Sequence, residues 1–236
     1  MKYILASALL LGTATGMKAQ DSVEGTVNVD FVSQYIWRGQ DLGNVSVQPT
    51  LGIEWKGLSL SAWGSVGLTS ASDTKEFDLT LGYSIKGFNV GITDYWFNQG
   101  QDPRGRYFMY EKDRTNHVFE GNIGYDFGFL NVQWFTNFAG NDGFNDKGKR
   151  AYSSYFELSA PFKFAKCDWT ATVGAVPYAT DFYGASGFAI TNIGLRASKS
   201  FDIKDKVEIP VFADITANPC SQKAYFTIGF AITPKL

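Results

Sequence analysis

The chain has little of the chemistry on which metal and cofactor sites are built. It contains one histidine, His117, and two cysteines among its 236 residues. No second histidine is available to complete a pair of imidazole ligands, and no Cys-x-x-Cys motif or glycine-rich phosphate loop occurs. The sequence therefore predicts no metal ion and no cofactor.

Long apolar runs and clustered positive charge are also missing. Beyond the N-terminus, no segment approaches the roughly 18 consecutive apolar residues that a membrane-spanning helix needs, and the mean hydropathy is −0.13. The chain has 21 basic and 23 acidic residues and no basic patch, so nucleic acid is a poor candidate partner. A helical membrane protein is excluded. A membrane β-barrel is not, because half of each of its strands is polar.

Residues 1–20 have the pattern of a secretory signal peptide. Lys2 supplies a positive start, residues 4–11 supply an apolar core, and small residues follow. An exported protein is therefore expected, with a single β-barrel domain over residues 21–236.

The sequence does contain repeated alternation of apolar and polar residues, which places them on opposite faces of a strand. Aromatic residues make up 16% of the chain, and this composition favours sheet over helix. Tight turns such as Lys56-Gly57 alternate with longer connections, of which 98–114 is the longest. The alternating segments predict about twelve strands: 22–37, 44–55, 58–68, 75–86, 88–97, 115–127, 129–139, 150–164, 167–177, 187–200, 206–217 and 223–233.

This rhythm of connections predicts the fold class. Short periplasmic turns and longer extracellular loops are typical of an all-β, transmembrane, antiparallel up-and-down β-barrel. A soluble all-β protein is the alternative, but it offers no reason for connection lengths to alternate. Cys167 and Cys220 fall at opposite rims of the predicted barrel, farther apart than the about 7 Å between Cα atoms that a disulfide allows. We predict that both are unpaired.

The outward faces of the predicted strands match a lipid environment with one exception. In the first strand the apolar face ends at Tyr35 and Trp37, whose rings would join an aromatic girdle at the long-loop rim. Asp94 counts as outward in its strand. We expect it near the rim or at a bulge, because a charge facing lipid costs little near the interface.

The inward faces carry the residues on which any function would depend. Acids outnumber bases there, so a water-filled lumen would favour cations or neutral polar solutes over anions. The same groups are equally suited to a hydrogen-bonded polar plug. The residues expected to line the lumen are Asp30, Gln34, Glu120, Asn122, Glu157, Arg196 and Asp214.

Two functions follow from these alternatives. The favoured one is a narrow channel or passive transporter for small polar or cationic solutes. The other is a non-conducting barrel with a polar plug that binds a ligand or partner through its extracellular loops. Loop 98–114 has mixed charge and several aromatic residues, which suits a fold into the lumen mouth, an exposed contact surface or a tolerated insertion.

An outer-membrane lipid-modifying enzyme is the least favoured function. Its general base would have to be His117. The nearest candidate nucleophiles, Ser153 and Ser154, begin a strand two positions away, and no Gly-x-Ser-x-Gly turn occurs. We therefore expect that the protein is not an enzyme.

The first predicted strand runs into Val32-Ser33-Gln34-Tyr35-Ile36-Trp37-Arg38-Gly39, and Val47-Gln48-Pro49 and Leu60-Ser61-Ala62-Trp63-Gly64 follow. These segments resemble a family of Gram-negative outer-membrane β-barrel proteins of unknown function, the Gcw or TorF-type group. The resemblance implies an outer-membrane barrel without an established substrate, with outer-membrane lipid and the barrel-assembly machinery as partners. It marks Arg38 and Gln48 as motif residues at the mouth, where Arg38 would pair with an acid inside the rim or cap the turn.

Overall fold

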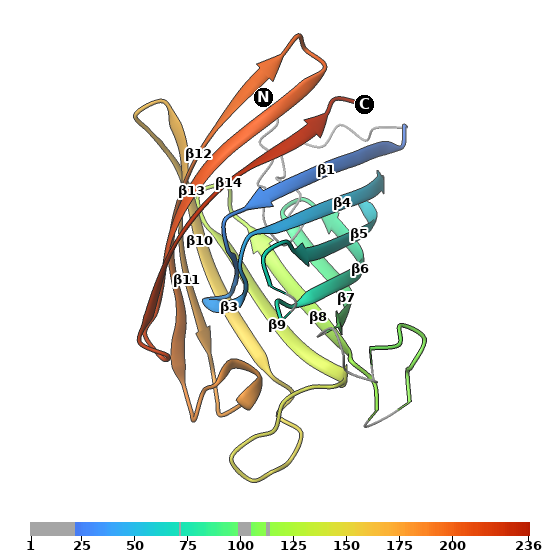
Figure 1. Ribbon diagram of the computed structural model, residues 1–236, viewed down its shortest axis with the longest axis vertical. Coiled ribbons are helices and arrows are strands. Elements are labelled where there is room, and N and C mark those ends of the chain that lie inside the picture. The colour runs from blue at the N-terminus through green and yellow to red at the C-terminus, as the bar shows by residue number, and fades with distance from the viewer. Residues whose placement is uncertain (1–21, 71, 99–104, 112–113) are drawn as a thin grey trace.

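The computed structural model describes residues 22–70, 72–98, 105–111 and 114–236. The signal peptide expected at 1–20 lies outside the described residues. Twelve antiparallel strands close into a barrel (Figure 1), which confirms the predicted fold class. They are β1 (Glu24–Val32), β4 (Ser46–Trp55), β5 (Leu58–Gly67), β6 (Lys75–Ile85), β7 (Phe88–Asn98), β8 (His117–Asp126), β9 (Asn131–Gly140), β10 (Ser154–Phe164), β11 (Cys167–Val176), β12 (Ala189–Ile203), β13 (Val207–Asn218) and β14 (Lys223–Pro234).

The first strand closes the barrel by pairing on both of its sides. Asp30 lies opposite Gln48 of β4 and opposite Ala231 of β14. The other neighbours follow one another along the chain, as in an up-and-down barrel. Because side chains alternate along each strand, every strand offers one face to the lumen and one to the outside.

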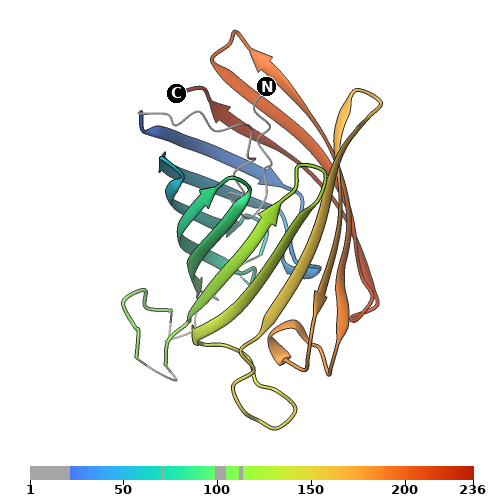
Figure 2. The same ribbon diagram turned by 180° about the vertical axis from the view of Figure 1, so that it is seen from behind.

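The connections have the alternating lengths that the sequence predicts. In the short turn between β4 and β5, Lys56 and Gly57 have φ of 50° and 85°, the left-handed backbone of a tight hairpin. The short turns lie at the same end of the barrel as the C-terminus. The longer connections 141–153 and 177–188 project from the opposite end (Figures 1 and 2). We call this opposite end the long-loop rim.

The two cysteines lie at opposite rims of the barrel. Cys167 begins β11 directly after the short turn that follows β10, and Cys220 lies between β13 and β14 at the long-loop rim. Both are free thiols, so the prediction that they are unpaired is confirmed.

The outer face of the barrel is apolar. Leu51 and Ile53 of β4 are 59% and 55% exposed, and Phe226 of β14 is 64% exposed. A band of exposed aliphatic and aromatic side chains around a closed barrel is what strands facing lipid present. No helix within the described ranges is long and apolar enough to cross a membrane.

The structure corrects the first predicted strand, which ends at Val32 and not at residue 37. The next residues form a separate two-stranded sheet, β2 (Tyr35–Trp37) and β3 (Gln40–Gly43). The chain reverses at Arg38 and Gly39, whose φ are 49° and 78°. We call residues 33–43 the inner hairpin because Figure 1 shows β3 inside the barrel.

The inner hairpin also overturns the predicted position of two aromatic residues. Tyr35 and Trp37 do not join a girdle at the rim; they are 5% and 6% exposed within the core of the protein. The alternation of apolar and polar residues continues through this segment because β2 is also an extended strand. The apolar side chains of β2, however, face the interior of the barrel and not the lipid. The other members of this core are Tyr95, Val118, Phe135, Tyr155, Val176, Tyr183 and Ala185.

Candidate functional site

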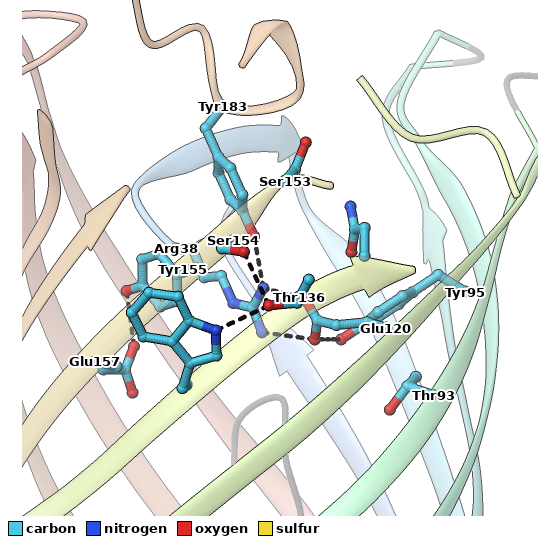
Figure 3. A network of polar contacts seen from close by, with 12 residues as sticks. Arg38, Thr93, Tyr95, Glu120, Thr136, Ser153, Ser154, Tyr155, Glu157 and Tyr183 are labelled. Atoms are coloured by element: carbon cyan, nitrogen blue, oxygen red, sulfur yellow. Dashed lines mark hydrogen bonds and ion pairs between the residues drawn. The ribbon is translucent and has the colours of Figure 1, made fainter. Parts of the chain in front are cut away.

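The turn of the inner hairpin carries Arg38 into the centre of the lumen, where it meets Glu120 of β8. Nη1 donates to Glu120 Oε2 at 2.6 Å and Nη2 donates to Oε1 at 2.9 Å (Figure 3). The two side chains are only 4% and 3% exposed. Such a bidentate Arg–carboxylate pair is among the stronger charge-assisted hydrogen-bond arrangements in proteins. It ties the hairpin to the far wall of the barrel.

Tyrosine hydroxyls complete the hydrogen bonding of this buried pair. Arg38 Nη1 also donates to the hydroxyl of Tyr183 at 2.6 Å, and the hydroxyl of Tyr95 donates to Glu120 Oε1 at 2.9 Å. Tyr183 belongs to the short helix η1 (Asp181–Tyr183) in the connection between β11 and β12. Removing two charges from water is costly unless their remaining donors and acceptors are satisfied. The two tyrosine hydroxyls satisfy one donor of Arg38 and one acceptor of Glu120.

Aromatic rings enclose the guanidinium group. Its Cζ lies 4.4 Å from the ring centroid of Trp37, 4.0 Å from that of Phe135 and 4.7 Å from that of Tyr155. Cation–π contacts of this kind gain strength when water is excluded. The rings therefore position the cation and also close off the space around it.

Two further contacts anchor the inner hairpin. The Tyr35 hydroxyl donates to Glu76 Oε2 of β6 at 2.8 Å, and Asn218 Nδ2 of β13 donates to the carbonyl oxygen of Gly39 at 2.9 Å. A Cβ at Gly39 would lie 1.8 Å from the backbone oxygen of Thr191, so only glycine permits this approach. The hairpin is thus held to β6, β8 and β13 at once.

A cavity of about 240 Å³ lies between the inner hairpin and the wall formed by β10 to β14. Glu157 on this wall accepts from the Tyr155 hydroxyl at 2.8 Å. Arg196 donates through Nε and Nη2 to Asp214 at 2.6 and 2.8 Å, and its Cζ lies 4.1 Å from the ring centroid of Phe212. The cavity therefore combines a carboxylate, an internally compensated ion pair and aromatic surface.

The remaining lumen residues predicted from the sequence are spread over several small contacts. Asp30 accepts from Asn28 Nδ2 at 2.5 Å. The other contacts join Gln34 to Asp41 at 3.0 Å, Gln48 to Ser65 at 3.2 Å and Asn122 to Asn89 at 3.4 Å. Gln34 and Gln48 line the cavity beside Glu157, Arg196 and Asp214, whereas Asp30, Glu120 and Asn122 do not.

Carboxyl groups outnumber basic groups in the interior of the barrel. Arg38 pairs with Glu120 and Arg196 pairs with Asp214. Further carboxyl groups on inward-facing positions of the described strands are those of Asp30, Glu76, Asp78 and Glu157. Within the described ranges, no cluster of His, Cys, Asp or Glu is arranged to hold a metal ion.

Sequence reasoning missed the aromatic part of the site. Tyr155 and Tyr183 contact the Arg38 region from sequence positions more than a hundred residues away, and no local pattern marks them. The alternating pattern predicts the outer face for Trp37, because it does not show that β1 ends at Val32. The signal that was available is the Arg38-Gly39 pair, in which glycine after a charged residue interrupts an apolar segment.

His117 lies on the outward face of β8 but is covered and not exposed. Its ring is 0% exposed, with Nδ1 2.7 Å from Asp94 Oδ1 and Nε2 2.6 Å from the carbonyl oxygen of Tyr107. Asp94 near the rim is thereby explained without a bulge. The candidate nucleophiles lie elsewhere: Ser153 is hydrogen-bonded to Thr180 at 2.6 Å.

The described part of loop 98–114 does not fold into the lumen mouth, which is one of the three possibilities considered for it. Residues 105–111 lie beside the barrel and not across its mouth (Figures 1 and 2). The ring of Tyr107 contacts the rings of Phe77 and Trp96 on the outer wall, with centroids 5.7 and 5.5 Å apart. This segment is therefore not a lumen plug. Phe108 is 88% exposed, so an exposed contact surface and a tolerated insertion both stay predictions.

Comparison with solved structures identifies the architecture. The NanC porin superimposes with a TM-score of 0.53 at 8% sequence identity, over 89% of this chain and 100% of that chain. The KdgM porin gives 0.47 at 8% identity, over 89% and 99%, and an outer membrane channel from Pseudomonas putida F1 gives 0.41 at 12% identity, over 89% and 94%. At such identities the likeness to the NanC porin shows the fold alone, a closed antiparallel β-barrel like that of this porin.

Comparison of the sequence gives the family. No curated protein matches the chain. The family model described as a bacterial protein of unknown function, Gcw_chp, matches residues 17–217. Because this match spans most of the 236 residues, the chain belongs to the Gcw_chp family.

Proposed function

We propose that the protein is a narrow channel or passive transporter for small polar or cationic solutes in the outer membrane of a Gram-negative bacterium. The observation that carries the proposal is the surplus of carboxyl groups in the lumen beside a cavity that polar and aromatic side chains line. Arg38 and Arg196 are already engaged with Glu120 and Asp214. The remaining acids, among them Glu157 at the cavity, lower the energy of a cation inside the barrel.

The inner hairpin would set the bore of this channel. It occupies the lumen and is anchored on three strands, so solutes would pass between it and the wall of β10 to β14, where the cavity lies. Export through a cleaved signal peptide, insertion by the barrel-assembly machinery and contact with outer-membrane lipid are parts of the same proposal.

Reconstitution in planar bilayers tests the channel. Wild-type protein is expected to show discrete conductance steps. Under a KCl gradient, the sign of the reversal potential should show that the channel prefers K⁺ over Cl⁻. Glu157→Gln should reduce that preference, because it removes a lumen charge without removing its hydrogen-bonding shape. Glu111→Gln is the matched control, since Glu111 is 59% exposed in the outer loop and its charge lies outside the lumen.

The second candidate is a non-conducting barrel that binds a ligand or partner through its loops. The firm attachment of the inner hairpin through Arg38, Tyr35 and Gly39 favours it. A silent bilayer with correctly folded wild type would support this function. Conductance that appears only when Arg38→Met releases the hairpin would identify the hairpin as the plug.

We propose no catalytic role for His117, because both of its ring nitrogens are engaged by Asp94 and Tyr107. A base must have a free nitrogen within reach of its substrate. Hydrolysis or acyl transfer on phospholipid vesicles should therefore be absent in wild type. Activity that is present and abolished by His117→Ala would overturn this part of the proposal.

A further inference from the structure

A segment of the long loop is fastened to the outer wall of the barrel by a buried histidine. Residues 105–111, which we call the strap, cover His117 with the rings of Tyr107 and Tyr110. The Tyr110 ring stacks on the imidazole with centroids 4.2 Å apart, and the Tyr107 ring lies edge-on at 5.2 Å. His117 is 0% exposed as a result, although the outer face of β8 beyond it is open at Ile123, which is 51% exposed.

The hydrogen bonds of His117 require two protons at the site. The oxygen of Tyr107 is a backbone carbonyl and can only accept, so Nε2 must carry a proton and donate. Asp94 Oδ1 lies 2.7 Å from Nδ1, and a second proton must lie between these two atoms. Either the imidazole is a cation beside a carboxylate or a neutral imidazole accepts from a protonated Asp94. In both cases the pair holds one proton more than a neutral imidazole beside a carboxylate.

We propose that His117 and Asp94 form a pH-sensitive latch that holds the strap against the outer wall. When the extra proton leaves, only one of the two contacts of His117 can keep a hydrogen. The contact with the Asp94 carboxylate is the stronger, because one partner is charged, so Nδ1 retains the proton. Nε2 then turns a lone pair toward the carbonyl oxygen of Tyr107, and the strap loses its attachment.

Two elements besides β8 supply groups that face His117. Asp94 comes from β7, and Tyr107 and Tyr110 come from the strap. Desolvation raises the pKa of Tyr110 to about 12, so its hydroxyl stays neutral. Histidine is the side chain whose charge ordinarily changes between about pH 5 and pH 8.

The remaining neighbours add little to this response. The ring of Phe119 packs against the imidazole from the same strand. At the end of the strap, Glu111 and Arg114 pair with each other at 2.7 Å in solvent. Asp78, on the lumen side of β6, interacts electrostatically with Asp94 through the wall.

The latch is independent of the proposed channel, because the strap lies on the outside of the barrel and not at the cavity. Hydrogen exchange of the full chain in lipid nanodiscs tests it, with exchange rates corrected for the intrinsic effect of pH. The amides of 105–111 should be protected at pH 5.5 and exchange roughly tenfold faster at pH 8.5, the size expected from the loss of a single hydrogen bond.

Two variants separate the latch from simple packing. In Asp94→Asn the new amide can donate to Nδ1 while Nε2–H still donates to Tyr107, so the strap should stay protected at both pH values. His117→Phe keeps the ring but has no donor, so the strap should exchange fast at both. Far-UV circular dichroism would show that the barrels of both variants are folded. Wild-type protection that is equal at the two pH values, or pH dependence that persists in Asp94→Asn, would overturn the proposal.

Discussion

Arg38 and Glu120, separated by 82 positions in the sequence, form an ion pair in the centre of the barrel with Nη1 to Oε2 at 2.6 Å. Removing one partner leaves the other as a buried charge without compensation. Arg38→Met should therefore destabilise the protein by about 3–5 kcal/mol. Urea unfolding in lipid vesicles, followed by tryptophan fluorescence, measures the change.

The double variant Arg38→Met/Glu120→Met distinguishes an uncompensated charge from lost packing. Replacing a buried ion pair with apolar residues of similar volume is often close to neutral. The double variant should therefore be more stable than either single variant. If the effects of the two substitutions simply add, the pair is not coupled and the structural account of the lumen fails.

Gly39 offers a second test of the inner hairpin. Gly39→Ala must place a Cβ 1.8 Å from the backbone oxygen of Thr191 at a φ of 78°. Gly148→Ala is the matched control, because Gly148 also has a positive φ, 66°, but nothing within 4 Å. The control should cost about 1–2 kcal/mol from backbone strain. The substitution at Gly39 should exceed about 3 kcal/mol, as disruptive mutations do, in the same unfolding experiment.

Most of the barrel wall was predictable from the sequence, because each strand carries its own period-two pattern and three of the five short turns carry a glycine. The expected family is also confirmed by the match over residues 17–217. The inner hairpin was not predictable in this way. Tyr35 and Trp37 continue the alternation of the first strand, and alternation says which residues share a face but not whether that face meets lipid or the lumen.

The chemistry of the site was predictable only in outline. The sequence allowed Arg38 to pair with an acid inside the rim, yet Glu120 could not be chosen over the other inward acids without the register of β8. Tyr183 lies 145 positions from Arg38 in a connection that local pattern reads only as a loop. The sequence alone does not explain an outward-facing charge at Asp94. Its partner, His117, lies on the neighbouring strand, and the pairing of the two strands has to be known before this partner can be identified.

The two cysteines test the orientation of the barrel in the outer membrane. Cys220 is exposed at the long-loop rim, whereas Cys167 lies at the short-turn rim. A membrane-impermeant maleimide added to intact cells should label the protein through Cys220 alone. Labelling should disappear in Cys220→Ser and persist in Cys167→Ser. The reverse pattern would place the long loops on the periplasmic side.

A substitution at Tyr35 tests how much one hydrogen bond contributes to the attachment of the inner hairpin. Its hydroxyl donates to Glu76 Oε2 at 2.8 Å in a buried site, and hydrogen bonds to charged groups contribute about 1.5–3 kcal/mol. Tyr35→Phe removes that donor while keeping the ring that packs against Trp63 with centroids 5.6 Å apart. It should lower the free energy of unfolding by an amount in this range. Tyr83→Phe, at an outward position that is 40% exposed, should change it by less than about 0.5 kcal/mol. Equal effects of the two substitutions would mean that the hairpin is held by ring packing and not by its link to β6.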